Sequence, residues 1–389
     1  MTSKILIITS EYYGAPTKIG AHRFSDQLAK RNYEVTIISF PISPLYKLVS
    51  KKTGYVERNA NANQIIEVRN NLRTLVPKVL IPPLMQICKF FPYYTELWFR
   101  WNSTVSNFLK QSKFDIAICE SPLLQGIFKR TKASTKIIRV PDNFEGFWGS
   151  SAQLSQLIES FYSMAETIIS PSQQLISKYQ KIYPDKQVFQ VPNGVDESLF
   201  DEPRTTKDNS YRKEGPTAIY IGSLSKWFDF RLLYETAERR PEWTFLIIGK
   251  LESTHSSPPP NVNFLGAMPI ELATRYLVNA NCGLIPFDVR NHESLVNYVN
   301  PIKLYEYMAY GLPVIATRWK ELELLESPAI LIDNADELCR ALDDCERCDK
   351  SEELVAFARQ FTWQHITTNL LAKIETPDDT FEICSDTDR

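Results

Sequence analysis

Short apolar runs alternate with amphipathic segments along the first half of the chain. The first run spans Ile5 to Ile8, and a helix is predicted from Ala21 to Arg31 because Phe24, Leu28 and Ala29 share one face. Further buried strands are predicted at residues 35–40, 64–69, 115–119, 136–140, 167–169 and 187–191. Strands that alternate with helices in this way predict a parallel sheet in a doubly wound α/β domain.

The second half of the chain repeats the pattern. Strands are predicted at 217–221, 244–248, 262–264, 283–286 and 313–316, with helices at 230–239 and 301–310. Pro301 fits the first turn of the second helix, and Gly311 follows its last turn. The polar run at 201–215 has the composition of a linker.

The predicted organisation is therefore two Rossmann-like domains that face each other across a cleft. They comprise residues 1–200 and 216–362, separated by the linker 201–215. Residues 363–389 are expected to form a helix that returns to the first domain, followed by an acidic tail. In such folds, ligands bind beyond the carboxyl ends of the strands.

Charge is unevenly distributed although the net charge is only −2. Residues 1–120 hold 16 Lys and Arg against 8 Asp and Glu, which favours a basic face on the first domain. Within it, Leu75 to Trp101 is rich in aromatic residues that stand beside Lys78, Lys89 and Arg100. Prolines and charges prevent this segment from spanning a bilayer, but its composition is typical of a membrane interface. We expect a peripheral contact with the inner face of the cell membrane; the alternatives are a core helix and chance placement of solvated charges.

The cysteine pattern gives little sign of a metal site. Seven cysteines, an odd number in a chain that opens directly on a strand, favour reduced thiols and a cytoplasmic protein. Cys345 and Cys348 form a CxxC pair, but no second pair lies at a suitable spacing to complete a zinc site. The DxD-like triplet Asp386 to Asp388 is expected to be unstructured, so no metal or cofactor is predicted.

The helix that begins after Asn300 and Pro301 carries the strongest chemical signal. The N–H groups of Ile302 and Lys303 are unpaired within the helix, and its N-terminus carries a partial positive charge that favours a phosphate. Lys303 adds a full charge, and Glu306, three residues on, can accept hydrogen bonds from a ribose diol on the same face. The alternative is an ordinary amphipathic helix with a Lys–Glu pair.

Four motifs of the second half resemble those of the GT-B superfamily of glycosyltransferases. They are NPIKLYEYMAYGLPVIAT at 300–317, VPNGVD at 191–196, IYIGSLSKWFDFRLL at 219–233 and NVNFLG at 261–266. The resemblance implies that Lys303 and the helix N-terminus hold the donor diphosphate without a metal and that Glu306 holds the ribose. It also implies that Gly222 and Ser223 line the phosphate pocket.

The first half is similar to the GumK-type membrane-associated glucuronosyltransferases of xanthan synthesis. The matching stretches are PTKIGAHRFSDQLA at 16–29, CES at 119–121 and KIIRVPD at 136–142. The resemblance implies that Asp142 is the catalytic base, at the carboxyl end of a strand; a turn or N-cap aspartate is the alternative, and Glu145 is the reserve candidate. It further places Leu224 and Met268 around the nucleobase, and Lys18, His22 and Glu120 on the acceptor side, with helix capping as the alternative for His22.

Two departures from the commonest retaining branch favour an inverting reaction. Tyr298 stands where that branch has a glutamate, and Ser223 and Phe228 stand where it has basic residues. The resemblance thus predicts transfer of a sugar from a nucleotide-sugar donor, a UDP-sugar such as UDP-glucuronate, to a hydroxyl of a lipid-linked saccharide in cell-surface polysaccharide synthesis. The alternatives are a retaining transferase and a non-catalytic nucleotide-sugar-binding protein. A dehydrogenase is disfavoured because Gly14-Ala15-Pro16 breaks the GxGxxG pattern, and no nucleic-acid partner is predicted.

Overall fold

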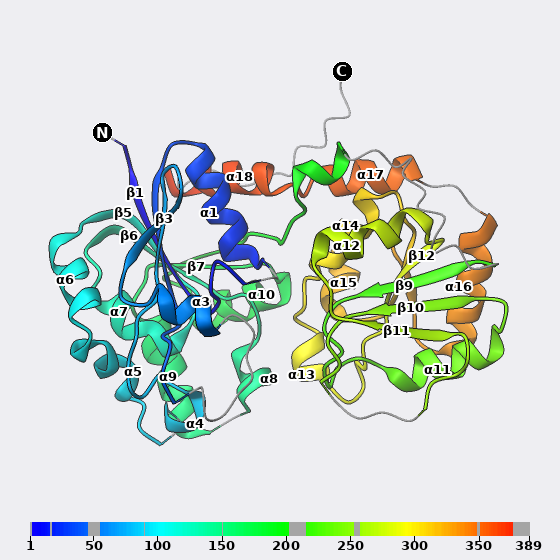
Figure 1. The fold of residues 1–389 in the computed structure, drawn as a ribbon, viewed down its shortest axis with the longest axis horizontal. Helices are drawn as coiled ribbons and strands as arrows, with labels where there is room; N and C mark the ends of the chain where they lie inside the picture. Colours follow the sequence, from blue (N-terminus) through cyan, green and yellow to red (C-terminus); the bar gives the residue numbers. More distant parts are fainter. Residues whose placement is uncertain are drawn as a thin grey trace.

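The computed structural model describes residues 2–15, 18–45, 55–88, 90–149, 151–201, 215–252, 257–347 and 351–375. These residues form two α/β domains that lie side by side (Figure 1). Each domain is built around one sheet, with eight strands in the first and six in the second. The predicted pair of doubly wound domains is confirmed. Nearly all of the linker expected at 201–215 lies outside the described residues. The same is true of Cys348 and of the tail after Glu375.

The first sheet has the strand order β3-β4-β2-β1-β5-β6-β7-β8. Its strands are β1 (Lys4–Thr9), β2 (Glu34–Ser39), β3 (Ile65–Arg69), β4 (Leu72–Leu75), β5 (Phe114–Cys119), β6 (Ala133–Arg139), β7 (Thr167–Ser170) and β8 (Gln187–Gln190). The helices are α1 (Gly20–Lys30), α3 (Tyr55–Ala60), α4 (Met85–Cys88), α5 (Tyr94–Leu97), α6 (Ser103–Gln111), α7 (Gln125–Arg130), α8 (Phe144–Trp148), α9 (Ala152–Tyr162) and α10 (Gln173–Ile182), with short 3₁₀ helices at Trp98–Trp101 and Pro122–Leu124.

Both faces of this sheet are buried at its central strands. Leu6 and Ile8 of β1 pack into the core on one side, and Ile5 and Ile7 pack into the core on the other. Because side chains alternate along a strand, a continuous apolar run such as Ile5 to Ile8 is what a sheet covered on both faces requires.

One strand departs from the predicted parallel sheet. β3 pairs antiparallel with β4, which the sequence pattern did not indicate. The two strands are joined by a tight turn in which Asn71 has a positive φ of 61°. Two residues are enough for an antiparallel hairpin, whereas a parallel connection needs a crossover of a dozen residues or more.

The second sheet has the strand order β11-β10-β9-β12-β13-β14, and its neighbouring strands pair in parallel. Its strands are β9 (Thr217–Ile221), β10 (Thr244–Ile248), β11 (Val262–Gly266), β12 (Cys282–Ile285), β13 (Val314–Thr317) and β14 (Ile330–Ile332). The helices are α11 (Phe230–Arg239), α12 (Ile270–Ala273), α13 (Glu293–Val296), α14 (Ile302–Ala309), α15 (Lys320–Leu324), α16 (Ala335–Arg347) and α17 (Ser351–Arg359), with a 3₁₀ helix at Thr274–Asn279.

The chain passes between the domains twice, and the two passages pair with each other. Val195 forms a parallel bridge with Thr362, and its N–H donates to the carbonyl of Phe361. Gly194 is required here because a Cβ atom would lie 2.5 Å from both the Phe361 carbonyl oxygen and Ile366 Cδ1. After the second passage, α18 (Trp363–Glu375) lies along α1 of the first domain, while α17 lies over the second domain (Figure 1).

The segment from Leu75 to Trp101 divides into a buried part and an exposed part. Trp98 and Phe99 are buried in the core of the first domain, so the end of the segment is a core element of that domain. Five apolar side chains on either side of α4 are exposed: Leu80, Ile81, Phe90, Phe91 and Tyr93. None of the helices in the described ranges is both long and apolar enough to cross a membrane.

Candidate donor and acceptor site

Helix α14 begins one residue later than predicted, with Pro301 as its N-cap. The cyclic side chain of Pro301 has no N–H to satisfy, and the N–H groups of Ile302 and Lys303 precede the first intrahelical hydrogen bond. The helix ends at Ala309, one residue before the predicted end, and Gly311 follows its C-cap with a φ of 69°; its N–H donates to the carbonyl of Met308 over 2.8 Å. Its N-terminus can therefore receive a phosphate.

Lys303 lies between two aromatic rings above the end of β9. Its Nζ is 5.3 Å from the centroid of the Tyr220 ring and 5.2 Å from that of Phe287. Burial lowers the pKa of Lys303 to about 8, and the neighbouring Glu306 opposes that shift. Burial raises the pKa of Glu306 in turn. Both side chains keep some solvent exposure, so a ligand can reach them.

The strand-end glycine leaves room for the lysine. A Cβ atom on Gly222 would lie 3.1 Å from Lys303 Cε and 2.9 Å from the Tyr220 hydroxyl. Ser223, next along the chain, is exposed, and its carbonyl accepts a hydrogen bond from the Tyr220 hydroxyl over 2.9 Å. The structure thus brings Gly222 and Lys303 together, as the sequence predicts for a phosphate pocket.

Asp142 follows β6 and Pro141 at the boundary between the domains. It does not cap α8, because the N-cap of that helix is Asn143, whose amide donates to the carbonyl of Ser294 in the second domain over 2.8 Å. Asp142 is partly exposed, and its pKa is raised to about 6, chiefly by burial. Arg139 opposes the shift, and Glu120 reinforces it.

Glu120 has a different role from the predicted contact with the acceptor. Its side chain and that of Arg139 are both 4% exposed, and they form an ion pair of 2.6 Å. Its other carboxylate oxygen accepts from the Thr9 hydroxyl over 2.8 Å. Glu120 therefore serves as the internal counter-charge of an arginine that lies within a buried strand.

Two residues of this network were missed by sequence reasoning. Arg139 donates to the side-chain oxygen of Asn193 over 2.9 Å, and Asn193 donates to the backbone carbonyl of Asn300 over 2.9 Å. The carboxylate of Glu120 is thus connected to Asn300, two residues before α14 in the other domain. The sequence feature that could have indicated these contacts is Arg139 itself, since an arginine inside the apolar run KIIRV requires a buried acceptor.

Asn300, predicted on the donor side, takes part in hydrogen bonds between the two domains. It is 4% exposed, and its side-chain oxygen accepts from the Asn193 backbone N–H and the Tyr305 hydroxyl. Leu224, predicted near the nucleobase, is buried in the core of the second domain, whereas Met268 is partly exposed. Ile302 packs against the core of the first domain, so its backbone N–H is what it can offer to a ligand.

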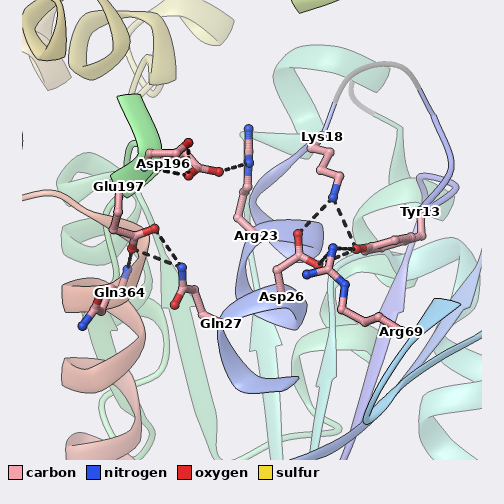
Figure 2. Close-up of polar contacts among 10 residues, drawn as sticks. Tyr13, Lys18, Arg23, Asp26, Gln27, Arg69, Asp196, Glu197 and Gln364 are labelled. Atoms are coloured by element: carbon pink, nitrogen blue, oxygen red, sulfur yellow. Dashed lines mark hydrogen bonds and ion pairs between the residues drawn. The ribbon is translucent and has the colours of Figure 1, made fainter. Parts of the chain in front are cut away.

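The loop predicted to face the acceptor is anchored on α1. His22 is fully buried, and its Nδ1 accepts from the backbone N–H of Ile19, so the capping alternative is the one observed. Burial lowers the pKa of His22. Lys18 pairs with Asp26 over 3.0 Å, beside Tyr13 and Arg69 (Figure 2).

Glu145, the reserve base, is exposed and paired with Lys178 over 2.7 Å. Because such a carboxylate is well solvated and engaged by a cation, it is poorly placed to act as a base. In the described part of the chain, no three His, Cys, Asp or Glu side chains are grouped so that they could hold a metal ion.

Comparison with known protein families finds a match in each half of the chain. Residues 7–143 match the family described as glucuronosyltransferase GumK, N-terminal domain, and residues 215–346 match glycosyl transferases group 1. Together with the two sheets, these matches decide the family. The chain is a glycosyltransferase of the GT-B fold.

Two relatives by sequence share parts of this GT-B chain. The UDP-glucuronate:glycolipid 2-beta-glucuronosyltransferase of Xanthomonas campestris pv. campestris is 23% identical over 329 residues, which are 80% of this chain and 76% of that enzyme. A Bacillus subtilis (strain 168) protein, TuaH, named as a glycosyltransferase of teichuronic acid biosynthesis, is 27% identical over 154 residues. That match covers 37% of this chain and 38% of TuaH.

Solved structures share the fold over nearly the whole length. Sucrose-phosphate synthase of Thermosynechococcus elongatus has a TM-score of 0.68 at 14% identity, and the match covers 96% of this chain and 99% of that one. Anabaena HepE, in complex with UDP and glucose, has a TM-score of 0.64 at 13% identity and covers 96% and 100%. At these identities, the likeness establishes the GT-B fold alone.

Proposed function

We propose that this glycosyltransferase moves a sugar from a UDP-sugar to a hydroxyl of a lipid-linked saccharide, with inversion and without a metal ion. The observation that carries the proposal is the arrangement at α14, where Lys303 lies over Gly222 at the N-terminus of the helix and Glu306 follows one turn later. This arrangement offers charged and N–H donors to a diphosphate and a carboxylate to a ribose.

The choice of UDP and of the sugar rests on the relatives. The Xanthomonas enzyme is named for UDP-glucuronate and a glycolipid, and HepE is described in complex with UDP. UDP-glucuronate is therefore the donor we favour, and a glycolipid is the favoured class of acceptor. Synthesis of a cell-surface polysaccharide agrees with the name of TuaH as well.

Asp142 is the residue we assign as the base. With a pKa of about 6 it is ionised at neutral pH, yet it is basic enough to receive a proton in the transition state. The acceptor oxygen forms a bond to the sugar C1 as its proton passes to Asp142. The bond from C1 to the diphosphate breaks in the same step, and Lys303 with the helix N-terminus stabilises the departing negative charge. These donors supply the electrostatic stabilisation that a metal ion would otherwise provide.

The exposed apolar side chains around α4 support a peripheral membrane contact. Phe90, Phe91 and Tyr93 are 78%, 68% and 79% exposed, in the half of the chain that carries excess positive charge. Aromatic and basic residues together suit the interface of an anionic membrane, where a lipid-linked acceptor would be found.

Transfer assays with an Asp142→Asn variant test the proposal. We expect sugar transfer to fall by about 100-fold or more, while UDP binding measured by calorimetry stays within about twofold of the wild type. Normal transfer by Asp142→Asn would refute the assignment of the base. Failure of the wild type to bind UDP, GDP or dTDP would refute the donor site. A retaining reaction would appear in the anomeric configuration of the product.

A further inference from the structure

Arg23 reaches from the first domain toward the donor side of the second. It lies in α1, and its guanidinium forms an ion pair with Asp196, in the first passage between the domains (Figure 2). The two side chains are 23% and 30% exposed, so solvent screens the pair only in part. An arginine in this position can also interact with other groups at the same boundary.

The donor helix presents one face to this part of α1. Ile302, at the start of α14, packs against the cluster that contains Ala21 and Phe24 of α1. Glu306 lies four residues after Ile302, on the same face of the helix. The carboxylate assigned to the ribose is therefore turned toward the helix that carries Arg23.

The charges around Glu306 agree with this geometry. Burial raises the pKa of Glu306, Arg23 and Lys303 lower it, and Asp196 raises it. The influence of Arg23 is larger than that of Lys303, although Lys303 belongs to the same helix as Glu306. The cations that act on Glu306 thus come from both domains.

We infer that Arg23 is a positioning residue for the donor, which orients the Glu306 carboxylate toward the ribose from across the domain boundary. This inference rests on the proposed function, because it needs Glu306 as the ribose ligand. It makes the donor site a property of both domains, since the second domain alone lacks the guanidinium. Asp196 completes the arrangement by fixing the guanidinium.

Other polar residues of α1 serve a different purpose. The side-chain amide of Gln27 donates to both carboxylate oxygens of Glu197. Glu197 also accepts from the backbone N–H of Gln364 at the start of α18 (Figure 2). Arg31 donates to the carbonyl of Gln364 and to the Thr368 hydroxyl, each over 2.8 Å. These contacts tie α1 to α18 and provide a matched control.

The test compares UDP with 2′,3′-dideoxy-UDP, which lacks the ribose diol, in the variants Arg23→Ala, Arg23→Lys, Arg31→Ala and Glu306→Gln. We expect Arg23→Ala to weaken UDP binding by about tenfold, the effect of disturbing one charged hydrogen bond, and to change dideoxy-UDP binding by less than about twofold. Arg23→Lys should recover part of the loss. Because both residues act on one contact, the double variant Arg23→Ala/Glu306→Gln should bind UDP no more weakly than Glu306→Gln.

Two outcomes would overturn the inference. An equal loss for UDP and dideoxy-UDP, or an equal loss in Arg31→Ala, would show that Arg23 has a structural role only. If Glu306→Gln binds UDP as tightly as the wild type does, the ribose assignment is refuted instead, and with it the proposed donor site. Melting temperatures of the variants identify any loss of the fold.

Discussion

The carboxylate of Glu321, in the second domain, accepts a hydrogen bond from the hydroxyl of Ser172, in the first domain, over 2.8 Å. It also accepts from the backbone N–H groups of Gln173 and Gln174, over 2.9 and 3.0 Å. These N–H groups open helix α10, so a residue of one domain satisfies the helix terminus of the other. Glu321 is 1% exposed, and burial raises its pKa.

Glu321→Ala should destabilise the protein by about 2–4 kcal/mol, because buried N–H groups at the start of α10 lose a charged acceptor. Glu323→Ala is the matched control, since Glu323 lies on the same helix with its side chain 46% exposed in a surface pair with Arg318. Its expected effect is below about 0.5 kcal/mol. Urea unfolding measures both, and equal stability of the two variants would contradict this role of Glu321.

Contacts between site residues that are close in the sequence could be predicted, whereas contacts between distant residues could not. Lys303 and Glu306 share one helix, so their spacing alone places them on one face, and Gly222 was identified through a strand-end motif. The ion pairs of Arg139 with Glu120 and of Arg23 with Asp196 join residues that are 19 and 173 positions apart. No local periodicity encodes such contacts, because they arise only when the sheet and the domains have assembled.

The fold shows the same limit. The long apolar strands were predictable from their composition, but β4, with the sequence LRTL, has too short and too polar a pattern to be recognised. Its pairing with β3 is decided by the tight turn at Asn71. Likewise, the buried state of His22 and Leu224 depends on what packs over them, so their predicted contacts with ligands could not be judged from the sequence.

Asp142 should show a conflict between stability and function. Its pKa rises from 3.8 in the unfolded chain to about 6 in the fold, so the native state binds more protons between these values. Native stability therefore falls as the pH rises from 4 to 6, by at most about 1.4 kcal/mol for each unit of pKa shift. Asp142→Asn should remove this loss and be more stable than the wild type above pH 6, with no advantage below pH 4. Thermal unfolding across this pH range checks the prediction, and a parallel pH dependence in both proteins would contradict it.

Transfer activity should respond to the same ionisation. The base is competent when ionised, so kcat/KM of the wild type is expected to fall as the pH drops through about 6. Glu120→Gln should move this acid limb to lower pH, because Glu120 raises the pKa of Asp142 and its loss also leaves Arg139 uncompensated. An acid limb that moves to higher pH, or does not move, would indicate that another group is the base.

Lys303 should set the alkaline limit of donor binding. Its pKa in the free protein is about 8, so a growing fraction of the side chain is neutral above this pH and the attraction for the diphosphate declines. Lys303→Met should weaken UDP binding by about 10- to 100-fold at pH 7 and remove the alkaline decline. Lys320→Met is the control, because Lys320 is 61% exposed in a surface pair with Glu293. Calorimetry between pH 7 and 10 gives both affinities; a wild-type affinity that is constant over this range would contradict the role of Lys303.

Substitution of the exposed side chains beside α4 should show whether they bind a membrane. Phe90→Ser/Phe91→Ser should fold normally, because these side chains are 78% and 68% exposed. Removing two aromatic rings from an interface should weaken binding to vesicles that contain anionic lipid by about tenfold or more, since buried apolar area contributes about 25 cal/mol per Å². Transfer to a lipid-linked acceptor should decline with it, while transfer to a water-soluble acceptor analogue should not.

The control for this prediction is Ile182→Ser, at the end of α10, where the side chain is 52% exposed outside the segment around α4. It should leave both vesicle binding and transfer unchanged. If the double phenylalanine variant loses activity equally on both acceptors, the segment acts on the fold or the active site. If it keeps full vesicle binding, the basic charge of the first domain suffices for the membrane contact and the aromatic side chains are not its cause.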